Sequence, residues 1–223
     1  MQKNNFWVIF ILFLSMKFAV AATQEQEIIA PDVKILMHQN VTTDLKPHLV
    51  FKTKKDANAW FKDMSHRLAR FVPSSRLRKE YLTIIQYEAA RAGLDPQLVL
   101  SVVTVESKFK QYALSKAGAR GLMQVMPFWV DLVGDPKQNL FDVQTNIRYG
   151  CTILRYYIQV ENGSLSKALA RYNGSSGKTW YPELVYQAHR RYWMASPILT
   201  IESGELVYVN YMKDNPIFNF DDY

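Results

Sequence analysis

Apolar residues recur at intervals of three and four positions in several segments of this 223-residue chain, which is the spacing of one face of an α-helix. The stripe is clearest in residues 55–71, where its members are Trp60, Phe61, Met64, Leu68 and Phe71. The segments that we predict to be helical are 55–71, 76–92, 96–106, 142–160, 164–172 and 182–194. Asp95 can cap the third of these helices with Pro96 in its first position, and Gly93 can end the second.

The segments outside these helices lack such a repeat. Residues 23–55 contain Pro31 and Pro47 and no sustained period, so we predict that they are extended or poorly ordered. Residues 198–211 alternate between apolar and polar positions around a Ser-Gly-Glu turn, which indicates a β-hairpin. The overall prediction is a mainly α protein.

We divide the chain where composition changes. Residues 1–22 are predicted to be a secretory signal peptide, because Lys3 precedes an apolar run and small residues follow at 19–22. The apolar run is shorter than the roughly 20 residues that a membrane span needs. The other divisions are an N-terminal extension with one helix (residues 23–75), a helical domain (residues 76–196), and a C-terminal hairpin and tail (residues 197–223).

Glu106 is the most informative residue, because it is a carboxylate on the apolar side of a predicted helix. The residues that share its face are Val99, Val102, Val103 and Phe109. Burial against such a surface disfavours the ionised carboxylate and raises its pKa, so the group can serve as a general acid near neutral pH. The alternative is a glutamate at a helix end that points to solvent or pairs with Lys108 or Lys110.

The segment after Glu106 is too rich in glycine to be helical. Gly118 and Gly121 allow positive φ or a close approach of the backbone to a ligand. The Gln124 amide is available for hydrogen bonds to such a ligand, and Met123 would line or underpin the groove that holds it. Val125 and Met126 are interpreted as core residues.

Residues 106–127 resemble the signature of the lytic transglycosylases related to goose-type lysozyme. The shared pattern is Glu-Ser, an aromatic residue two positions later, Gly-Ala-Arg-Gly-Leu-Met-Gln at residues 118–124, and Met-Pro at residues 126–127. The resemblance extends upstream to Tyr87, Ala90 and residues 93–96, and downstream to Asn146-Ile147, Gly150, Leu154 and residues 168–175. It covers about residues 80–195 and implies a lysozyme-like helical domain.

The resemblance also implies a reaction and a site. Glu106 would be the catalytic acid that cleaves peptidoglycan between N-acetylmuramic acid and N-acetylglucosamine, leaving a 1,6-anhydro ring. The residues implied to bind substrate are Ser107, Gly121, Met123, Gln124, Tyr172, Asn173 and Tyr181. The family carries a tyrosine close to the catalytic glutamate, four positions before a valine. Tyr181 before Val185 fits that spacing, and Tyr186 is the competing candidate.

Two other functions remain open from the residues alone. A hydrolytic muramidase on the same scaffold would use a second carboxylate, for which the candidates are Asp131, Asp135, Asp142, Glu161 and Glu183. The family works with one carboxyl, because water is not a reactant. A non-catalytic peptidoglycan-binding module of an envelope-spanning machine is the other alternative, and the presence of Glu106 with the full loop argues against it.

Charge and composition add limits on partners and location. The net charge is +7, and removal of Lys3 and Lys17 with the signal peptide leaves about +5. Peptidoglycan and nucleic acid both attract a basic protein, but no nucleic-acid-binding motif is present, so we expect no nucleic acid partner. We expect an exported, periplasmic protein that is at most peripheral to the membrane. The extension and tail leave an envelope protein partner open.

Neither a cofactor nor a disulfide is predicted. The four histidines (His38, His48, His66 and His189) show no ligand-like spacing, so we expect no metal, and His189 is interpreted as a helix-surface residue. Cys151 is the only cysteine, which precludes a disulfide within the chain, and we interpret it as a buried small apolar residue.

Overall fold

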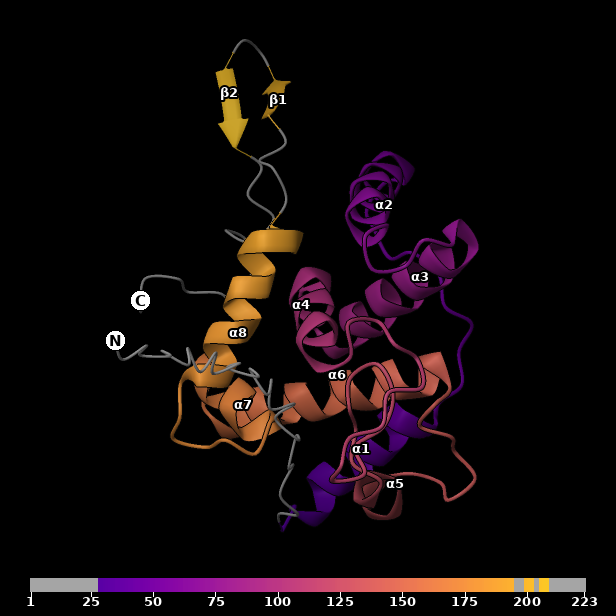
Figure 1. Ribbon diagram of the computed structural model, residues 1–223, viewed down its shortest axis with the longest axis vertical. Coiled ribbons are helices and arrows are strands. Elements are labelled where there is room, and N and C mark those ends of the chain that lie inside the picture. Colours follow the sequence, from indigo (N-terminus) through magenta and orange to yellow (C-terminus); the bar gives the residue numbers. More distant parts are fainter. Residues whose placement is uncertain (1–27, 195–198, 203–204, 209–223) are drawn as a thin grey trace, which may run out of the picture.

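The computed structural model describes residues 28–194, 199–202 and 205–208, which are mainly helical (Figure 1). The helices are α1 (Pro31–Thr42), α2 (Lys54–Leu68), α3 (Ser75–Ala92), α4 (Pro96–Glu106), α5 (Phe128–Val133), α6 (Val143–Val160), α7 (Leu165–Tyr172) and α8 (Trp180–Ala188). A π-helical turn, η1 (His189–Trp193), continues α8. The strands β1 (Leu199–Glu202) and β2 (Glu205–Tyr208) pair antiparallel, with Leu199 opposite Tyr208.

Local signals set the ends of the helices that build the site. The side chain of Asp95 accepts a hydrogen bond from the Gln97 N–H at 2.9 Å and caps α4, as predicted. Asp142 caps α6 in the same way through the Thr145 N–H at 2.8 Å. Gly93 ends α3 with a φ of +65°, a left-handed conformation that glycine adopts without the steric cost that a Cβ would add.

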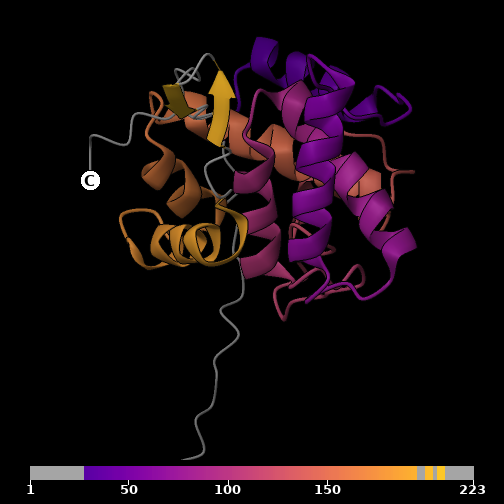
Figure 2. The ribbon, with the colours of Figure 1, turned by 90° about the horizontal axis from the view of Figure 1, so that it is seen from above.

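Helix α4 lies in the middle of the molecule, between α3 on one side and α8 on the other (Figures 1 and 2). Helix α6 contacts α3, α7 and α1. The core between these helices is built from apolar and aromatic side chains that are fully buried, among them Leu100, Trp129, Tyr157 and Trp193. This arrangement is consistent with a lysozyme-like helical domain, and it buries almost all of α4 before its last turn.

The prediction that residues 23–55 are extended or poorly ordered was wrong for α1, and the extension contains two helices instead of one. Met37 and Val41 are one turn apart and buried, and half-buried Val33 extends their stripe. Exposed Ile35 and Leu36 obscure this period in the sequence. The helix is therefore stabilised mainly by packing on the domain, and its isolated pattern is too weak to predict it.

The segment between α1 and α2 is held against α3 by a pair of hydrogen bonds. The Val50 N–H donates to Gln86 Oε1 and the Gln86 side-chain amide donates to the Val50 carbonyl, each at 2.8 Å. Gln86 is almost fully buried, so these bonds satisfy a polar group that would otherwise destabilise the fold. The extension is thereby attached to the helical domain at Val50.

Several predictions fall on residues outside the described ranges. The signal peptide (residues 1–22) and the end of the tail lie there. So do residues 203–204 between β1 and β2, and the predicted hairpin therefore stays a prediction. Among the residues that are described, none of the helices combines the length and apolar character needed to cross a membrane.

Candidate active site

Glu106 is the last residue of α4 and lies at the edge of the core. Its helix neighbours Val99, Val102 and Val103 are fully buried, as the apolar pattern predicts. Glu106 itself is half-buried, at the boundary between the core and solvent. Lys108 and Lys110 are exposed, and no ion pair joins either of them to Glu106 in the described part of the chain.

Tyr181 supplies the hydrogen bond that Glu106 makes within the protein. It lies in the first turn of α8, is 1% exposed, and donates its hydroxyl to Glu106 Oε1 at 2.5 Å. This is the tyrosine that the spacing before Val185 favours. Tyr186 lies more than one turn further along the same helix.

Burial raises the pKa of Glu106 from its usual 4.5 to about 7, and the hydrogen bond from Tyr181 acts in the opposite direction. At neutral pH a substantial fraction of Glu106 is therefore protonated and able to donate a proton. The pKa of Tyr181 lies well above its ordinary value, because it is buried and close to Glu106 and Tyr172. Tyr181 consequently keeps its proton and remains a donor.

The backbone turns sharply after Glu106. Lys108 and Phe109 have φ values of +51° and +62°, a left-handed conformation that costs a non-glycine residue about 1–2 kcal/mol. Ser107 ties this turn to the following loop, because its hydroxyl lies 2.8 Å from the Leu122 carbonyl and 3.2 Å from the Val103 carbonyl. The sequence does not predict this turn, because neither residue is a glycine.

The glycine-rich loop is cross-linked by amide side chains. Asn146 of α6 donates from Nδ2 to the carbonyls of Arg120 and Leu140, and its Oδ1 accepts from the Met123 N–H, all at 2.8 Å. A Cβ on Gly121 would lie 2.3 Å from Asn146 Nδ2, so this position requires glycine both for space and for its φ of +76°. Asn146 belongs to the sequence resemblance, but its structural role is not readable from the sequence.

Gln124 also acts within the loop. Its Nε2 donates to the carbonyls of Ala113 and Gly121 at 3.1 and 2.9 Å, and its side chain is almost fully buried. The amide nitrogen that we expected to face a ligand is therefore already hydrogen-bonded inside the protein. Its expected role in substrate binding stays a prediction.

Met123 packs inside the protein, against α6. Its side chain is 0% exposed and packs on α6 at Gly150, where a Cβ would lie 2.3 Å from the Met123 sulfur. Its expected role in substrate binding stays a prediction, because the family pattern does not show which face of the loop each residue takes. Its carbonyl accepts a hydrogen bond from the buried Tyr172 hydroxyl at 2.7 Å. Met123 and Tyr172 thus connect the loop to α6 and α7.

The contact between Gly150 and Met123 predicts that an alanine at position 150 destabilises the protein, which is unusual for a helix interior. Alanine normally stabilises a helix interior by about 1 kcal/mol relative to glycine. We expect Gly150→Ala to lower the free energy of unfolding by about 1–3 kcal/mol instead, because the added methyl group overpacks the Met123 side chain. Urea unfolding measures this, with Gln159→Ala at an exposed position of the same helix as the control. A stabilised Gly150→Ala variant would contradict the packing.

Asn173 differs from the other predicted binding residues. It follows α7 and is 4% exposed, yet its side-chain amide makes no hydrogen bond within the described residues. Ser107, Tyr172 and Tyr181 all direct their hydroxyl groups to protein acceptors. The Asn173 amide therefore has hydrogen-bonding capacity left for a ligand.

The candidate second carboxylates are engaged elsewhere or exposed. Asp142 caps α6, Asp135 accepts from the Lys137 N–H at 2.9 Å, and Glu161 forms an ion pair with Arg171 at 2.6 Å. Asp131 and Glu183 are exposed. None of the five makes a hydrogen bond to Glu106 or contributes to its pKa shift within the described residues.

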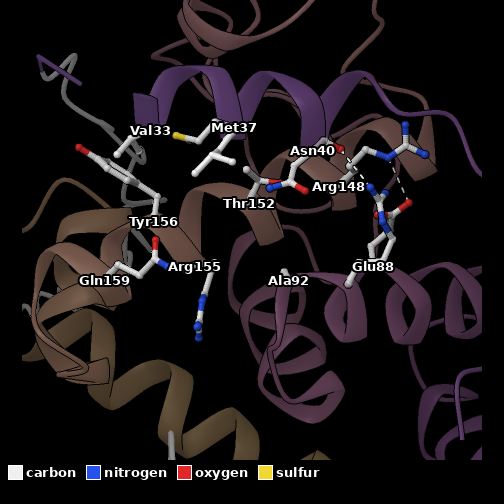
Figure 3. Close-up of a pocket in the computed structure, with 12 residues that line it drawn as sticks. Val33, Met37, Asn40, Glu88, Ala92, Arg148, Thr152, Arg155, Tyr156 and Gln159 are labelled. Carbon is white, nitrogen blue, oxygen red and sulfur yellow. Dashed lines mark hydrogen bonds and ion pairs between the residues drawn. The ribbon is translucent and has the colours of Figure 1, made fainter. Parts of the chain in front are cut away.

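A cavity of about 190 Å³ lies away from these residues, where α1 crosses α3 and α6 (Figure 3). Its lining includes the buried Glu88, which forms ion pairs with Arg91 at 2.9 Å and Arg148 at 3.1 Å. Neither Glu106 nor any predicted binding residue lines it. Glu88 is already paired with two arginines, so it is not free to bind a ligand. We therefore interpret this cavity as a gap where the N-terminal extension packs against the helical domain.

No group of three or more histidine, cysteine, aspartate or glutamate side chains that could hold a metal ion occurs among the described residues. His189 is half-buried, with Nδ1 at 3.2 Å from Ser101 Oγ, so its interpretation as a helix-surface residue was wrong. Burial lowers its pKa and favours the neutral imidazole. Cys151 is buried, as predicted.

Comparison with known proteins identifies relatives of the region that carries this geometry. Residues 83–190 match the family described as Transglycosylase SLT domain. Curated relatives include the membrane-bound lytic murein transglycosylase C of Yersinia pestis (strain Pestoides F) and of Yersinia pseudotuberculosis serotype O:1b (strain IP 31758). Each is 32% identical in an alignment of 114 residues that covers 44% of this chain and 32% of the relative. The chain therefore spans about one third of the length of these relatives.

Proposed function

We propose that this chain is a peptidoglycan lytic transglycosylase, and the match of residues 83–190 to the family described as Transglycosylase SLT domain supports this proposal. The substrate would be the glycan strand of peptidoglycan, cleaved between N-acetylmuramic acid and N-acetylglucosamine. The single observation that carries the proposal is the half-buried Glu106, with a pKa of about 7 and the hydroxyl of Tyr181 at 2.5 Å. The relatives, which are named as murein transglycosylases, support the same reaction class.

In the proposed reaction Glu106 acts twice. The protonated carboxyl gives its proton to the glycosidic oxygen as the bond from that oxygen to C1 of the muramyl residue breaks. The muramyl N-acetyl oxygen stabilises the positive charge that develops at C1. Ionised Glu106 then takes the proton of the muramyl 6-hydroxyl, whose oxygen bonds to C1 and closes the 1,6-anhydro ring. Glu106 ends the cycle protonated, and no water is consumed.

The surroundings of Glu106 suit this double role. A general acid–base group works best when its pKa is near the working pH, because both of its protonation states are then accessible. We propose that Tyr181 orients the carboxyl group, and that Asn173 with the backbone around Gly121 binds the sugar. Ser107, Met123, Gln124 and Tyr172 would hold the loop that forms this surface, a role that their buried hydrogen bonds and packing support.

We further propose that the protein is exported and acts in the cell envelope, peripheral at most to the membrane. The predicted signal peptide and the names of the relatives, which are called membrane-bound, support this location. Residues 76–196 would form the catalytic domain. We also propose an envelope protein partner that binds the extension or the C-terminal segment.

Mass spectrometry of soluble products tests the proposal directly. Purified peptidoglycan treated with the protein is expected to release muropeptides that end in 1,6-anhydro-N-acetylmuramic acid, one water lighter than hydrolytic products. The internal 6-hydroxyl outcompetes water because a well-oriented intramolecular nucleophile reaches an effective molarity of about 10⁵–10⁸ M. Products dominated by reducing-end muramic acid would reject the lyase reaction and identify a muramidase. Absence of any glycan cleavage would favour the binding-module alternative.

A further inference from the structure

The strained turn after Glu106 is held by an aromatic cluster, which comprises Phe71, Phe109, Tyr192 and Trp193. Phe109 is the second of the two residues with positive φ, and its side chain is 5% exposed. Its ring centroid lies 5.4 Å from that of Phe71 and 5.7 Å from that of Trp193. A residue in an unfavourable backbone conformation persists only when its surroundings fix it, and these rings are the surroundings of Phe109.

The aromatic cluster also contacts the helix that carries Glu106. The Trp193 indole N–H donates to Thr104 Oγ1 at 2.8 Å, two residues before Glu106 on α4. The cluster therefore contacts the chain on both sides of Glu106, at Thr104 and at Phe109. A shift of these rings would move the end of α4 and change the position of the carboxyl group relative to Tyr181.

Phe71 is the member of the aromatic cluster that comes from the N-terminal extension. It follows α2 and stacks on Trp193 with ring centroids 6.0 Å apart, while its edge contact with Tyr192 has centroids 5.2 Å apart. Arg70 reinforces the same junction, because its guanidinium lies 5.1 Å from the centre of the Tyr192 ring. Phe71, Tyr192 and Trp193 all lie outside residues 83–190, the region that matches the family. The segments that flank the matched region thus supply three of the four rings.

We infer that Phe71 is a positioning residue of the active site, which acts through Phe109 to hold the turn that follows Glu106. The N-terminal extension is then part of the catalytic unit, and Phe71, which follows its last helix, fixes the place of the general acid. This inference rests on the proposed function for its kinetic consequence. Its structural content, the dependence of the Glu106 environment on Phe71, does not.

The kinetic test compares Phe71→Ala with Phe61→Ala in the full chain. Phe61 is a half-buried aromatic residue of α2 that packs on the core but makes no ring contact with the aromatic cluster in the described residues, so its loss controls for destabilisation. We expect Phe71→Ala to lower kcat on soluble glycan strands about 10- to 100-fold, because small displacements of a catalytic group have effects of this size. KM should change less than about threefold. Phe71→Tyr, which keeps the ring, should restore most of the activity.

Phe61→Ala should keep kcat within about twofold while it loses thermal stability comparable to that lost by Phe71→Ala. The inference is overturned if Phe71→Ala retains kcat within about twofold, or if Phe61→Ala loses as much kcat. If Phe71→Ala does not fold, Phe71→Leu replaces it, because a leucine fills much of the volume without the ring contacts. The same two kcat thresholds then apply.

A readout without turnover separates this inference from the proposed function. The pKa of Glu106 can be followed by NMR of its ¹³C-labelled carboxyl carbon in each variant. We expect it to fall from about 7 toward the usual 4.5 in Phe71→Ala and to stay in place in Phe61→Ala, because loosening the turn admits water to the carboxyl group. An unchanged pKa in Phe71→Ala overturns the inference. If the wild type cleaves no glycan but its Glu106 pKa responds to Phe71 alone, the proposed function fails and the positioning role stands.

Discussion

Replacing Glu106 with glutamine is expected to lower the release of soluble products by at least about 10²–10⁴-fold, the usual contribution of general acid–base catalysis. Glutamine preserves the size of the side chain and can still accept a hydrogen bond from Tyr181. It can neither deliver a proton to the glycosidic oxygen nor remove one from the 6-hydroxyl. Product release from purified peptidoglycan measures the loss. Activity within a few-fold of the wild type would contradict the role of Glu106.

The stability of the same variant at different pH values tests whether Glu106 is desolvated in the folded protein. Glu106 binds its proton more tightly in the folded state, with a pKa of about 7 against a usual 4.5. The wild type should therefore lose stability as the pH rises from about 4.5 to 7, because the unfolded state releases this proton first. Glu106→Gln lacks that loss. Its free energy of unfolding relative to the wild type should rise by about 1–3 kcal/mol between pH 4 and pH 8, allowing for partial exposure.

A loss of activity without this pH-dependent gain in stability would have a different meaning. It would indicate that Glu106 is solvated in the folded protein, with a pKa near its ordinary value. The acid step would then need another explanation for proton donation at neutral pH. Urea unfolding of both proteins at several pH values separates the two cases, since each measurement uses the same denatured reference.

The parts of the fold that depend only on residues close together in the sequence were predictable. Helices α3, α4 and α6 begin or end at residues whose own chemistry fixes the boundary, such as Asp95, Asp142 and Gly93. Helix α1 was missed because only Met37 and Val41 are buried on it, and their partners lie in the helical domain. A pattern of so few apolar residues acquires meaning only when the surface that covers it is known.

In the active site, too, only the features that depend on residues close together in the sequence were predictable. The apolar face of α4 predicts that Glu106 is desolvated, because the residues concerned are neighbours on one helix. The burial of Met123 and the contact of Phe71 with Phe109 were not predictable, since both depend on packing between segments that are distant in the chain. The strained turn at Lys108 and Phe109 could not be predicted either, because neither residue is a glycine. Aromatic packing and the Ser107 hydrogen bonds stabilise the turn instead.

Replacing Tyr181 with phenylalanine is expected to slow the proposed reaction about 10- to 100-fold, which corresponds to the roughly 1.5–3 kcal/mol of a hydrogen bond to a charged group. The lost hydroxyl is the one that donates to Glu106 Oε1 at 2.5 Å. Without it the carboxyl group can rotate away from the glycosidic oxygen. Tyr186→Phe, a change of the same size further along α8, is the matched control and should have a much smaller effect.

The pH dependence of the Tyr181 variant distinguishes a direct contact with Glu106 from a general loosening of α8. The hydroxyl stabilises the ionised carboxylate, so its removal should raise the pKa of Glu106 above about 7. The fall of kcat/KM on the basic side, where the acid loses its proton, should then move to higher pH. A loosened helix would admit water and move the same limb to lower pH. Displacement to lower pH in Tyr181→Phe, or a greater loss of rate in Tyr186→Phe, would contradict the assignment of Tyr181 as the partner of the catalytic acid.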